Sequence, residues 1–144
     1  MGHKTKVKVK RSSNKRFVRI VEAVIKDSKG RVLLLQRSTN NSTYVGKWQL
    51  PGGKAHKKES AIHAINREVF EETGRKCVVV DLLKEITFSE KFKGEESTVE
   101  LSIFSCKVKG SIILSKDHCK HKFVRASKLI KKILAPVSKK ALFD

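Results

Sequence analysis

The apolar and polar positions of the first quarter of the chain follow the period of β-strands. Phe17 to Lys26 is rich in β-branched residues and predicts a long first strand. Asp27 to Gly30 has the composition of a hairpin turn, so Arg31 to Gln36 is expected to return beside that strand. Three consecutive leucines, Leu33 to Leu35, are typical of a strand that is buried on both faces.

The second half of the chain combines further strands with short helices. Strands are predicted at Lys76 to Phe88, Thr98 to Val108 and Ile112 to Leu114, and the polar segment Ser89 to Ser97 is predicted to be a loop or hairpin end. Ser127 is a suitable N-cap for a helix through Ile133. Pro136 is suited to the first position of a last helix that ends at about Leu142.

One stretch between these groups of strands has the period of a helix. Ser60 is a good N-cap and Gly74 a good C-terminal stop, which predicts a helix from about Ser60 to Thr73. At about 100° per residue, one apolar stripe is formed by Ile62, Ile65 and Val69. Three carboxylates lie beside this stripe as neighbours on the helix surface, namely Glu68, Glu71 and Glu72.

Composition makes these carboxylates unusual, because the chain has a net charge of +19. Like charges at this spacing repel, and burial beside a core adds to the cost. A shared proton or a bound cation relieves the repulsion, and hard oxygen ligands suit Mg²⁺ or Mn²⁺. Arg67 lies one turn from Glu71 and could hold it through a bidentate pair. A solvated face of ion pairs is the alternative interpretation of the helix alone.

The wider spacing around this helix resembles the Nudix box, G-x5-E-x7-R-E-U-x-E-E-x-G-U, in which U is a bulky apolar residue. All seven invariant positions match, at Gly53, Glu59, Arg67, Glu68, Glu71, Glu72 and Gly74. Arg75 replaces the last apolar residue, and Val78 is expected to fill the space behind the helix. The segments Arg31 to Arg37 and Gly46 to Gly53 resemble the second strand and the approach to the box in MutT-like members.

The resemblance implies an α+β fold, an α/β/α sandwich in which a mixed β-sheet is flanked by helices. This Nudix hydrolase domain would span residues 17–144 and follow a basic, flexible N-terminal arm at residues 1–16. The implied enzyme uses Mg²⁺ or Mn²⁺ to hydrolyse a nucleoside diphosphate linked to another group. A non-catalytic module that binds polyanions on the same scaffold is the alternative.

The resemblance also assigns roles to the residues of the box. The metal ligands would be Glu68, Glu71 and Glu72 with the Gly53 carbonyl, and Glu59 would bind a second metal or support the site. Arg67 would orient the glutamates, and Glu68 or Glu71 is expected to be the general base. A carboxylate from the loop at 89–97, Glu95 or Glu96, is the alternative base or additional ligand.

Substrate-binding candidates lie outside the box. Arg37 is expected either to meet a substrate phosphate or to form a surface ion pair, and Trp48 either to stack on a base or to pack in the fold. The MutT-like approach favours a nucleoside triphosphate, cleaved to the monophosphate and pyrophosphate. The absence of Asn and Gln after Asn66 disfavours oxidised guanine nucleotides, while ADP-ribose, dinucleoside polyphosphates and capped RNA stay open.

Charge and cysteine content suggest partners and a compartment. The first sixteen residues hold seven positive charges and no acid, so RNA or another polyanion is a possible partner, with solubility as the alternative reason for the charge. Three cysteines without C-x-x-C spacing favour a reducing compartment, the cytoplasm. No apolar stretch is long enough for a bilayer, and a homodimer is possible. The His and Cys residues at 117–121 lack the second half of a zinc site.

Overall fold

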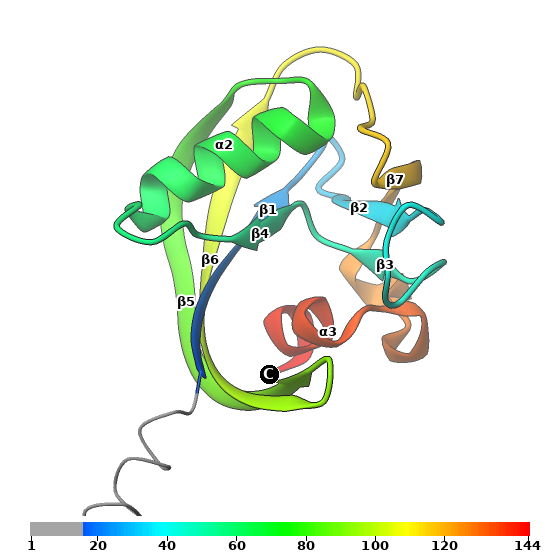
Figure 1. The fold of residues 1–144 in the computed structure, drawn as a ribbon. Coiled ribbons are helices and arrows are strands. Elements are labelled where there is room, and N and C mark those ends of the chain that lie inside the picture. The colour runs from blue at the N-terminus through cyan, green and yellow to red at the C-terminus, as the bar shows by residue number, and fades with distance from the viewer. Residues whose placement is uncertain (1–15) are drawn as a thin grey trace, which may run out of the picture.

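Seven strands divide between two sheets in residues 16–144, the part of the chain that the computed structural model describes (Figure 1). The larger sheet has the order β4 (Gly52–Lys54), β1 (Arg16–Ile25), β6 (Glu95–Val108), β5 (Cys77–Phe92). The smaller sheet has the order β3 (Trp48–Gln49), β2 (Val32–Arg37), β7 (His118–Val124). Because β1 is parallel to β6 and antiparallel to β4, the larger sheet is mixed, as predicted. The predicted basic arm lies outside the described residues, apart from Arg16.

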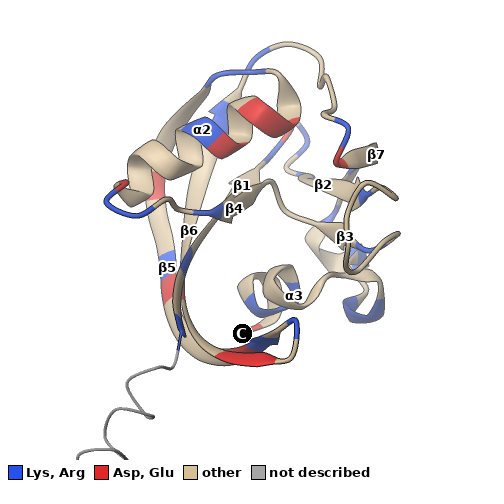
Figure 2. Ribbon diagram, in the orientation of Figure 1, with Lys and Arg blue, Asp and Glu red and all other residues tan. Residues whose placement is uncertain are grey.

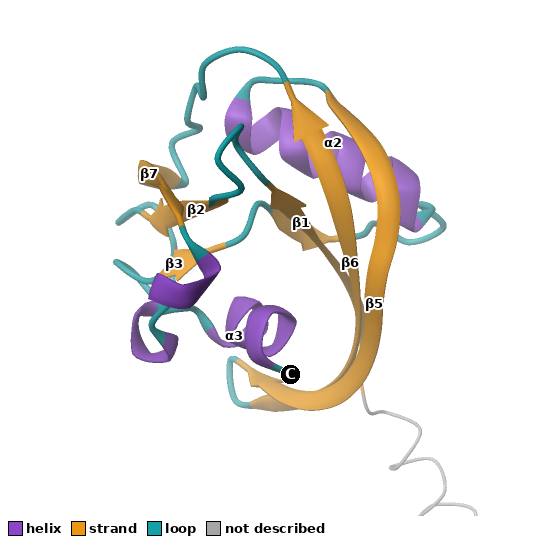
Figure 3. Ribbon diagram, turned by 180° about the vertical axis from the view of Figure 1, so that it is seen from behind, coloured by secondary structure: helices purple, strands orange, loops and turns teal. Residues whose placement is uncertain are grey.

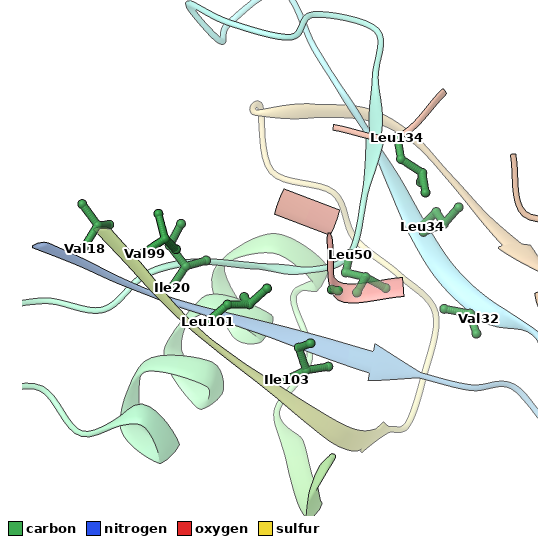
Figure 4. Close-up of a cluster of buried hydrophobic side chains, with 10 residues drawn as sticks. Val18, Ile20, Val32, Leu34, Leu50, Val99, Leu101, Ile103 and Leu134 are labelled. Carbon is green, nitrogen blue, oxygen red and sulfur yellow. The ribbon is translucent and has the colours of Figure 1, made fainter. Parts of the chain in front are cut away.

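Two helices cover opposite sides of these strands, α2 (Ala61–Thr73) and α3 (Pro136–Phe143), as Figures 1 and 3 show. One apolar cluster includes Leu34 together with Ala141 of α3, and Figure 4 shows most of its members. The other includes Leu33 and Leu35 together with Ile65 of α2. All three leucines are fully buried, which confirms that this strand has no solvent face. The helix–strands–helix arrangement confirms the predicted fold class.

The ends of α2 are where the sequence places them. The Ser60 side chain accepts a hydrogen bond from the His63 backbone N–H at 3.1 Å. Gly74 has a φ of 72° and its N–H donates to the Phe70 carbonyl, which closes the helix in a left-handed conformation that glycine tolerates best. The prediction that Ile62 belongs to the buried apolar stripe is wrong, because its side chain is 48% exposed. In the first turn the smaller Ala61 and Ala64 face the strands instead.

The loop after α2 is covered differently from the prediction. Val78 is 66% exposed and does not fill the space behind the helix. Ile113 lies against Gly74 instead, where an added Cβ would come within 2.9 Å of the Ile113 Cβ. The Ile113 N–H donates to the Thr73 carbonyl at 2.8 Å. Ile112 to Leu114 is therefore an irregular segment attached to the helix end, and not the short strand that its apolar run predicts.

Strand pairing also differs from the expected hairpin. β1 and β2 meet only at an isolated bridge between Lys26 and Val32, because both edges of β1 are occupied by β4 and β6. Ser89 to Ser97 is mostly strand, since β5 extends to Phe92 and β6 begins at Glu95 around a turn at Lys93 and Gly94.

The C-terminal helix prediction is confirmed at Pro136 and wrong for the segment before it. Ser127 to Ile133 forms two short 3₁₀ turns, η1 (Ala126–Lys128) and η2 (Lys131–Ile133), because Leu129 and Ile130 between them have extended backbone. Within residues 16–144, no helix combines the length and the apolar character needed to cross a membrane.

Candidate functional site

A cavity of about 500 Å³ opens between α2, the central strands, the 41–44 loop, the β5–β6 hairpin end and the start of α3. Four residues predicted for the site line it: Arg37, Gly53, Glu68 and Glu72. Figure 2 shows acidic positions toward the C-terminal end of α2 and basic positions on most other elements. The cavity is therefore acidic on its helix side within a strongly basic molecule.

Glu72 and Glu68 are the two carboxylates of α2 that face this cavity. Glu72 is 9% exposed and accepts a hydrogen bond from the Gly52 N–H at 2.9 Å. Burial raises the pKa of Glu72 well above its usual value, against that hydrogen bond, and the charge of Glu68 raises it further. Burial also raises the pKa of Glu68, opposed by Arg67 and reinforced by Glu71. Ionising both carboxylates is therefore costly unless a cation is bound beside them.

Gly53 brings backbone directly against one of these carboxylates. A Cβ at this position would lie 2.5 Å from Glu68 Oε2 and 2.6 Å from its carboxyl carbon. Any side chain here would displace Glu68 from the cavity wall. The glycine thus leaves the backbone of β4 and the carboxylate side by side, with no side chain between them.

Arg67 and Glu59 form a bidentate pair outside the cavity. Arg67 Nε and Nη2 donate to the two oxygens of Glu59 at 2.8 and 2.9 Å. The remaining nitrogen, Nη1, donates to Glu68 at 3.1 Å and to Glu71 at 3.2 Å. The hydrogen bonds between Arg67 and Glu59 lower the pKa of Glu59 and raise that of Arg67. Glu59 is placed to anchor the arginine that in turn holds Glu68.

Glu71 is the box carboxylate that the structure sets apart from the cavity. Its side chain is 53% exposed and directed to Arg67. Within residues 16–144, no three His, Cys, Asp or Glu side chains are gathered closely enough to form a complete metal site. Two carboxylates of one helix beside the Gly53 backbone still fit a hard cation whose other ligands are water and substrate oxygens, which is how Mg²⁺ is commonly held.

The two predicted substrate-binding residues lie in different surroundings. Arg37 lines the cavity, where its Nη1 donates to Gln49 Oε1 at 2.8 Å and its Nε to the Thr43 carbonyl at 3.0 Å. Its burial lowers the pKa of the guanidinium. Trp48 does not line the cavity; it packs against an apolar cluster, with the Lys122 ammonium 4.2 Å from its ring centre. Gln49, the next residue, lines the cavity in its place.

Several lining residues are not identified by motif or composition. They include Glu22, Gln49, Glu90, His118 and Ser138. Glu90 is the hairpin carboxylate at the cavity, whereas Glu95 is exposed and paired with Arg16 at 3.0 Å. Glu22 carries a signal that sequence could have used, because it is a single acid within the apolar run of the first strand.

His118 adds an uncharged polar group to the cavity. Burial lowers its pKa to about 4, with a further contribution from the charge of Arg37. Since the Gln49 amide nitrogen can only donate, His118 Nε2 accepts from it at 3.1 Å and Nδ1 carries the proton. The imidazole is therefore neutral at physiological pH. His118 belongs to the cluster at 117–121 in which the sequence lacks the second half of a zinc site.

Comparison with protein families and solved structures gives one consistent result. The model of the NUDIX domain family matches residues 16–143. A MutT protein from Methanosarcina mazei Go1 has a similar structure, with a TM-score of 0.76 and 34% sequence identity over 90% of this chain and 92% of that chain.

Curated relatives match over shorter stretches. A MutT-like protein of Streptomyces ambofaciens is 33% identical over 92 residues, which are 64% of this chain and 53% of that protein. The 8-oxo-dGDP phosphatase NUDT18 of Danio rerio is 42% identical over 64 residues, 44% of this chain and 19% of that protein. The chain thus spans about half or less of the length of these two relatives.

Proposed function

The chain belongs to the NUDIX domain family, and we propose that it is a hydrolase of nucleotides that carry a diphosphate bridge, dependent on Mg²⁺ or Mn²⁺. The observation that carries this proposal is the position of the buried Glu72 and the partly buried Glu68, two carboxylates with raised pKa values at one cavity wall beside Gly53. A non-catalytic polyanion-binding module has no need of such a costly arrangement.

The residues that line or adjoin the cavity have different roles in the proposed hydrolysis. Glu68, Glu72 and the Gly53 carbonyl would hold a divalent cation, which would supply charge neutralisation at the phosphate oxygens and a lowered pKa of bound water. Glu68 lines the cavity beside the proposed cation site and is suited to accept a proton from the attacking water. Arg67 orients Glu68, and Arg37, which also lines the cavity, offers a positive charge to a phosphate. Glu71 would join the cation only after leaving Arg67.

A nucleoside triphosphate, cleaved to the monophosphate and pyrophosphate, is the substrate class that we propose first. Similarity to two MutT-type proteins supports it. The relative named for 8-oxo-dGDP adds oxidised guanine diphosphates as candidates. Although no amide follows Asn66 in the chain, Asn41 and Gln49 both line the cavity, so oxidised guanine is no longer disfavoured on that ground. ADP-ribose, dinucleoside polyphosphates and capped RNA are the alternatives.

A panel of substrates tests this proposal directly. We expect Mg²⁺- or Mn²⁺-dependent release of pyrophosphate from at least one nucleoside triphosphate, with loss of turnover in EDTA and recovery on adding the metal. Products should be identified by chromatography for dNTPs, 8-oxo-dGDP, 8-oxo-dGTP, ADP-ribose, a dinucleoside tetraphosphate and capped RNA. Turnover of none of these by the metal-loaded protein would contradict the proposal.

Arg67→Lys is a test of the orienting role. Lysine keeps the positive charge but cannot hold Glu59 bidentately while also reaching Glu68. We expect kcat/KM to fall by about 10–100-fold, the usual cost of losing a group that orients a metal ligand. The matched control is Arg75→Lys, because Arg75 lies just past the same helix and its guanidinium donates to the Ser111 carbonyl and hydroxyl. An equal effect of both substitutions would reject the assigned role.

Partners and location are further parts of the proposal. A basic arm at residues 1–16 would recruit RNA or another polyanion, and its deletion should then remove salt-sensitive RNA binding. A reducing, cytoplasmic location is supported by the free thiols Cys77, Cys106 and Cys119. A homodimer is tested by the concentration dependence of sedimentation.

A further inference from the structure

Glu22 interrupts an otherwise apolar row on β1. Alternate residues of this strand face α3, and the row consists of Val18, Ile20, Glu22 and Val24. Figure 4 shows Val18 and Ile20 within the apolar cluster on that side. Glu22 is only 5% exposed, and burial raises its pKa to about 8 against a hydrogen bond from Ser138. A valine or isoleucine would satisfy the packing of this row at no electrostatic cost.

Ser138 holds one oxygen of this carboxyl group in place. The Ser138 hydroxyl accepts from the Leu50 N–H at 2.9 Å and donates its only proton to Glu22 Oε2 at 2.9 Å. The other oxygen, Oε1, is buried and has no hydrogen-bond partner among residues 16–144. A buried oxygen without a partner costs roughly 1–3 kcal/mol and is rare in proteins.

The unpaired oxygen belongs to a group that lines the cavity of the proposed active site. Glu22 and Ser138 are both lining residues, as is Glu72, whose pKa is raised in part by the charge of Glu22. Glu72 is assigned to the cation that neutralises the phosphate, and phosphate oxygens without protons cannot donate to Glu22 Oε1. For the ionised carboxylate of Glu22, the ligand group that suits Oε1 is therefore an uncharged hydrogen-bond donor.

We propose that Glu22 is a specificity-determining residue, whose Oε1 accepts a hydrogen bond from an N–H of the substrate's base or an O–H of its sugar, and that Ser138 is its positioning residue. The proposal rests on the function proposed above and deepens it by naming a residue that selects the nucleoside. A donor from the ligand would remove the cost of the unpaired oxygen and favour the ionised carboxylate. A nucleoside without that donor would leave the cost in place.

Glu22→Gln tests the proposal with little change of shape. Because the Ser138 proton needs an acceptor, the glutamine oxygen takes the place of Oε2 and its NH₂ group replaces Oε1. A donor then faces the donor of the ligand. We expect kcat/KM for the preferred nucleotide to fall by at least about tenfold, while poor substrates change by less than about threefold, so that the preference among nucleotides is compressed.

Two sets of probes separate the sources of the donor. The four dNTPs compare bases, and the preferred base is compared as its ribo- and deoxyribonucleotide. A change confined to the ranking of bases assigns the donor to the base, and a change confined to the ribo/deoxy ratio assigns it to the sugar. The same panels are run as nucleoside monophosphate binding by calorimetry, which requires no turnover and so tests the inference even if hydrolysis of these substrates fails.

The controls separate selectivity from structural and metal effects. Glu100→Gln makes the same substitution on the adjacent strand β6, outside the cavity, and should leave the ranking unchanged. Ser138→Ala should partly reduce the differences in kcat/KM among the nucleotides. Ser138→Thr keeps the hydroxyl and should retain the differences seen in the wild type. An equal loss for every nucleotide, or a shifted Mg²⁺ titration midpoint in Glu22→Gln, would overturn the proposal, since either would assign Glu22 to structure or metal binding.

Discussion

Glu72→Gln is expected to remove nearly all metal-dependent hydrolysis and at the same time to raise the stability of the metal-free protein. The two effects have one cause. Glu72 is buried, its pKa is raised well above the usual value, and Glu68 and Glu22 add repulsion. The ionised carboxylate of Glu72 thus destabilises the metal-free protein, and it is useful only when a cation is bound.

The size of each effect follows from the role proposed for Glu72. Loss of a charged ligand removes several kcal/mol of metal-mediated stabilisation, so kcat/KM should fall by on the order of 10²–10³-fold. Glutamine keeps an oxygen that accepts from the Gly52 N–H, so the fold should persist. Removing the buried ionisable group should stabilise the metal-free protein by about 1 kcal/mol or more at pH 8, which is roughly 2–4 °C in Tm.

Steady-state kinetics and thermal melts in EDTA measure the two effects on the same preparations. Glu96→Gln is the matched control, because Glu96 is an exposed residue of β6 that does not line the cavity. It should change neither quantity. If Glu72→Gln keeps its activity, Glu72 is not a metal ligand; if it loses both activity and stability, the carboxylate has a structural role instead.

Stability of the metal-free protein should fall as the pH rises from about 6.5 to 8. The pKa of Glu22 is about 8 in the folded protein and 4.5 as a free side chain. Between these values the native state binds a proton that the unfolded state has released, so the contribution of Glu22 is complete below pH 4.5 and is lost as the pH approaches 8. The raised pKa values of Glu68 and Glu72 act in the same direction.

The pH dependence that His118 contributes to stability has the opposite sign, and it sets the lower limit of the pH range in which stability falls. Its pKa is about 4 in the folded protein against 6.5 for the free side chain, so its contribution is complete above pH 6.5 and is lost as the pH falls to 4. Between pH 4.5 and 6.5 Glu22 and His118 oppose each other. Above pH 6.5 His118 no longer opposes Glu22, and Glu22 alone should lower the free energy of unfolding by about 2 kcal/mol between pH 6.5 and 8.

Urea unfolding in EDTA at pH 5.5, 6.5, 7.25 and 8 measures this profile. Glu22→Gln should reduce the slope between pH 6.5 and 8, while Glu100→Gln should leave it unchanged. A wild-type stability that is constant over this range would show that Glu22 is ionised in the folded protein. Addition of Mg²⁺ should flatten the profile by favouring the ionised carboxylates.

Local features of the chain could be predicted because they depend on neighbours in sequence. Ser60 and Gly74 close α2 through contacts three or four residues away, and Leu33 to Leu35 reveal a strand without a solvent face. The invariant residues of the box identify the family for the same reason. Predictions were wrong where long-range packing decides, as in the pairing of β1 and β2 and the irregular segment at Ile112 to Leu114.

The assignment of each box residue to a place in three dimensions required the tertiary structure. Spacing alone makes Glu68, Glu71 and Glu72 equivalent neighbours on a helix, but the rotation of α2 against the strands buries Glu72 and leaves Glu71 exposed. The same rotation exposes Ile62. Trp48 and Gln49 are adjacent in sequence, yet only Gln49 reaches the cavity, because successive residues of a strand point to opposite sides.

The sequence by itself determined the family, the fold class, the ends of α2 and the chemical types available for a metal site, since all of these follow from spacing and local propensity. Only the tertiary structure decided which carboxylates share a cavity, that Glu59 is held by Arg67, and that Glu22 meets Ser138 from 116 residues away. The physical reason is that burial and pairing, which set the pKa and role of each group, arise from packing between segments that are distant along the chain.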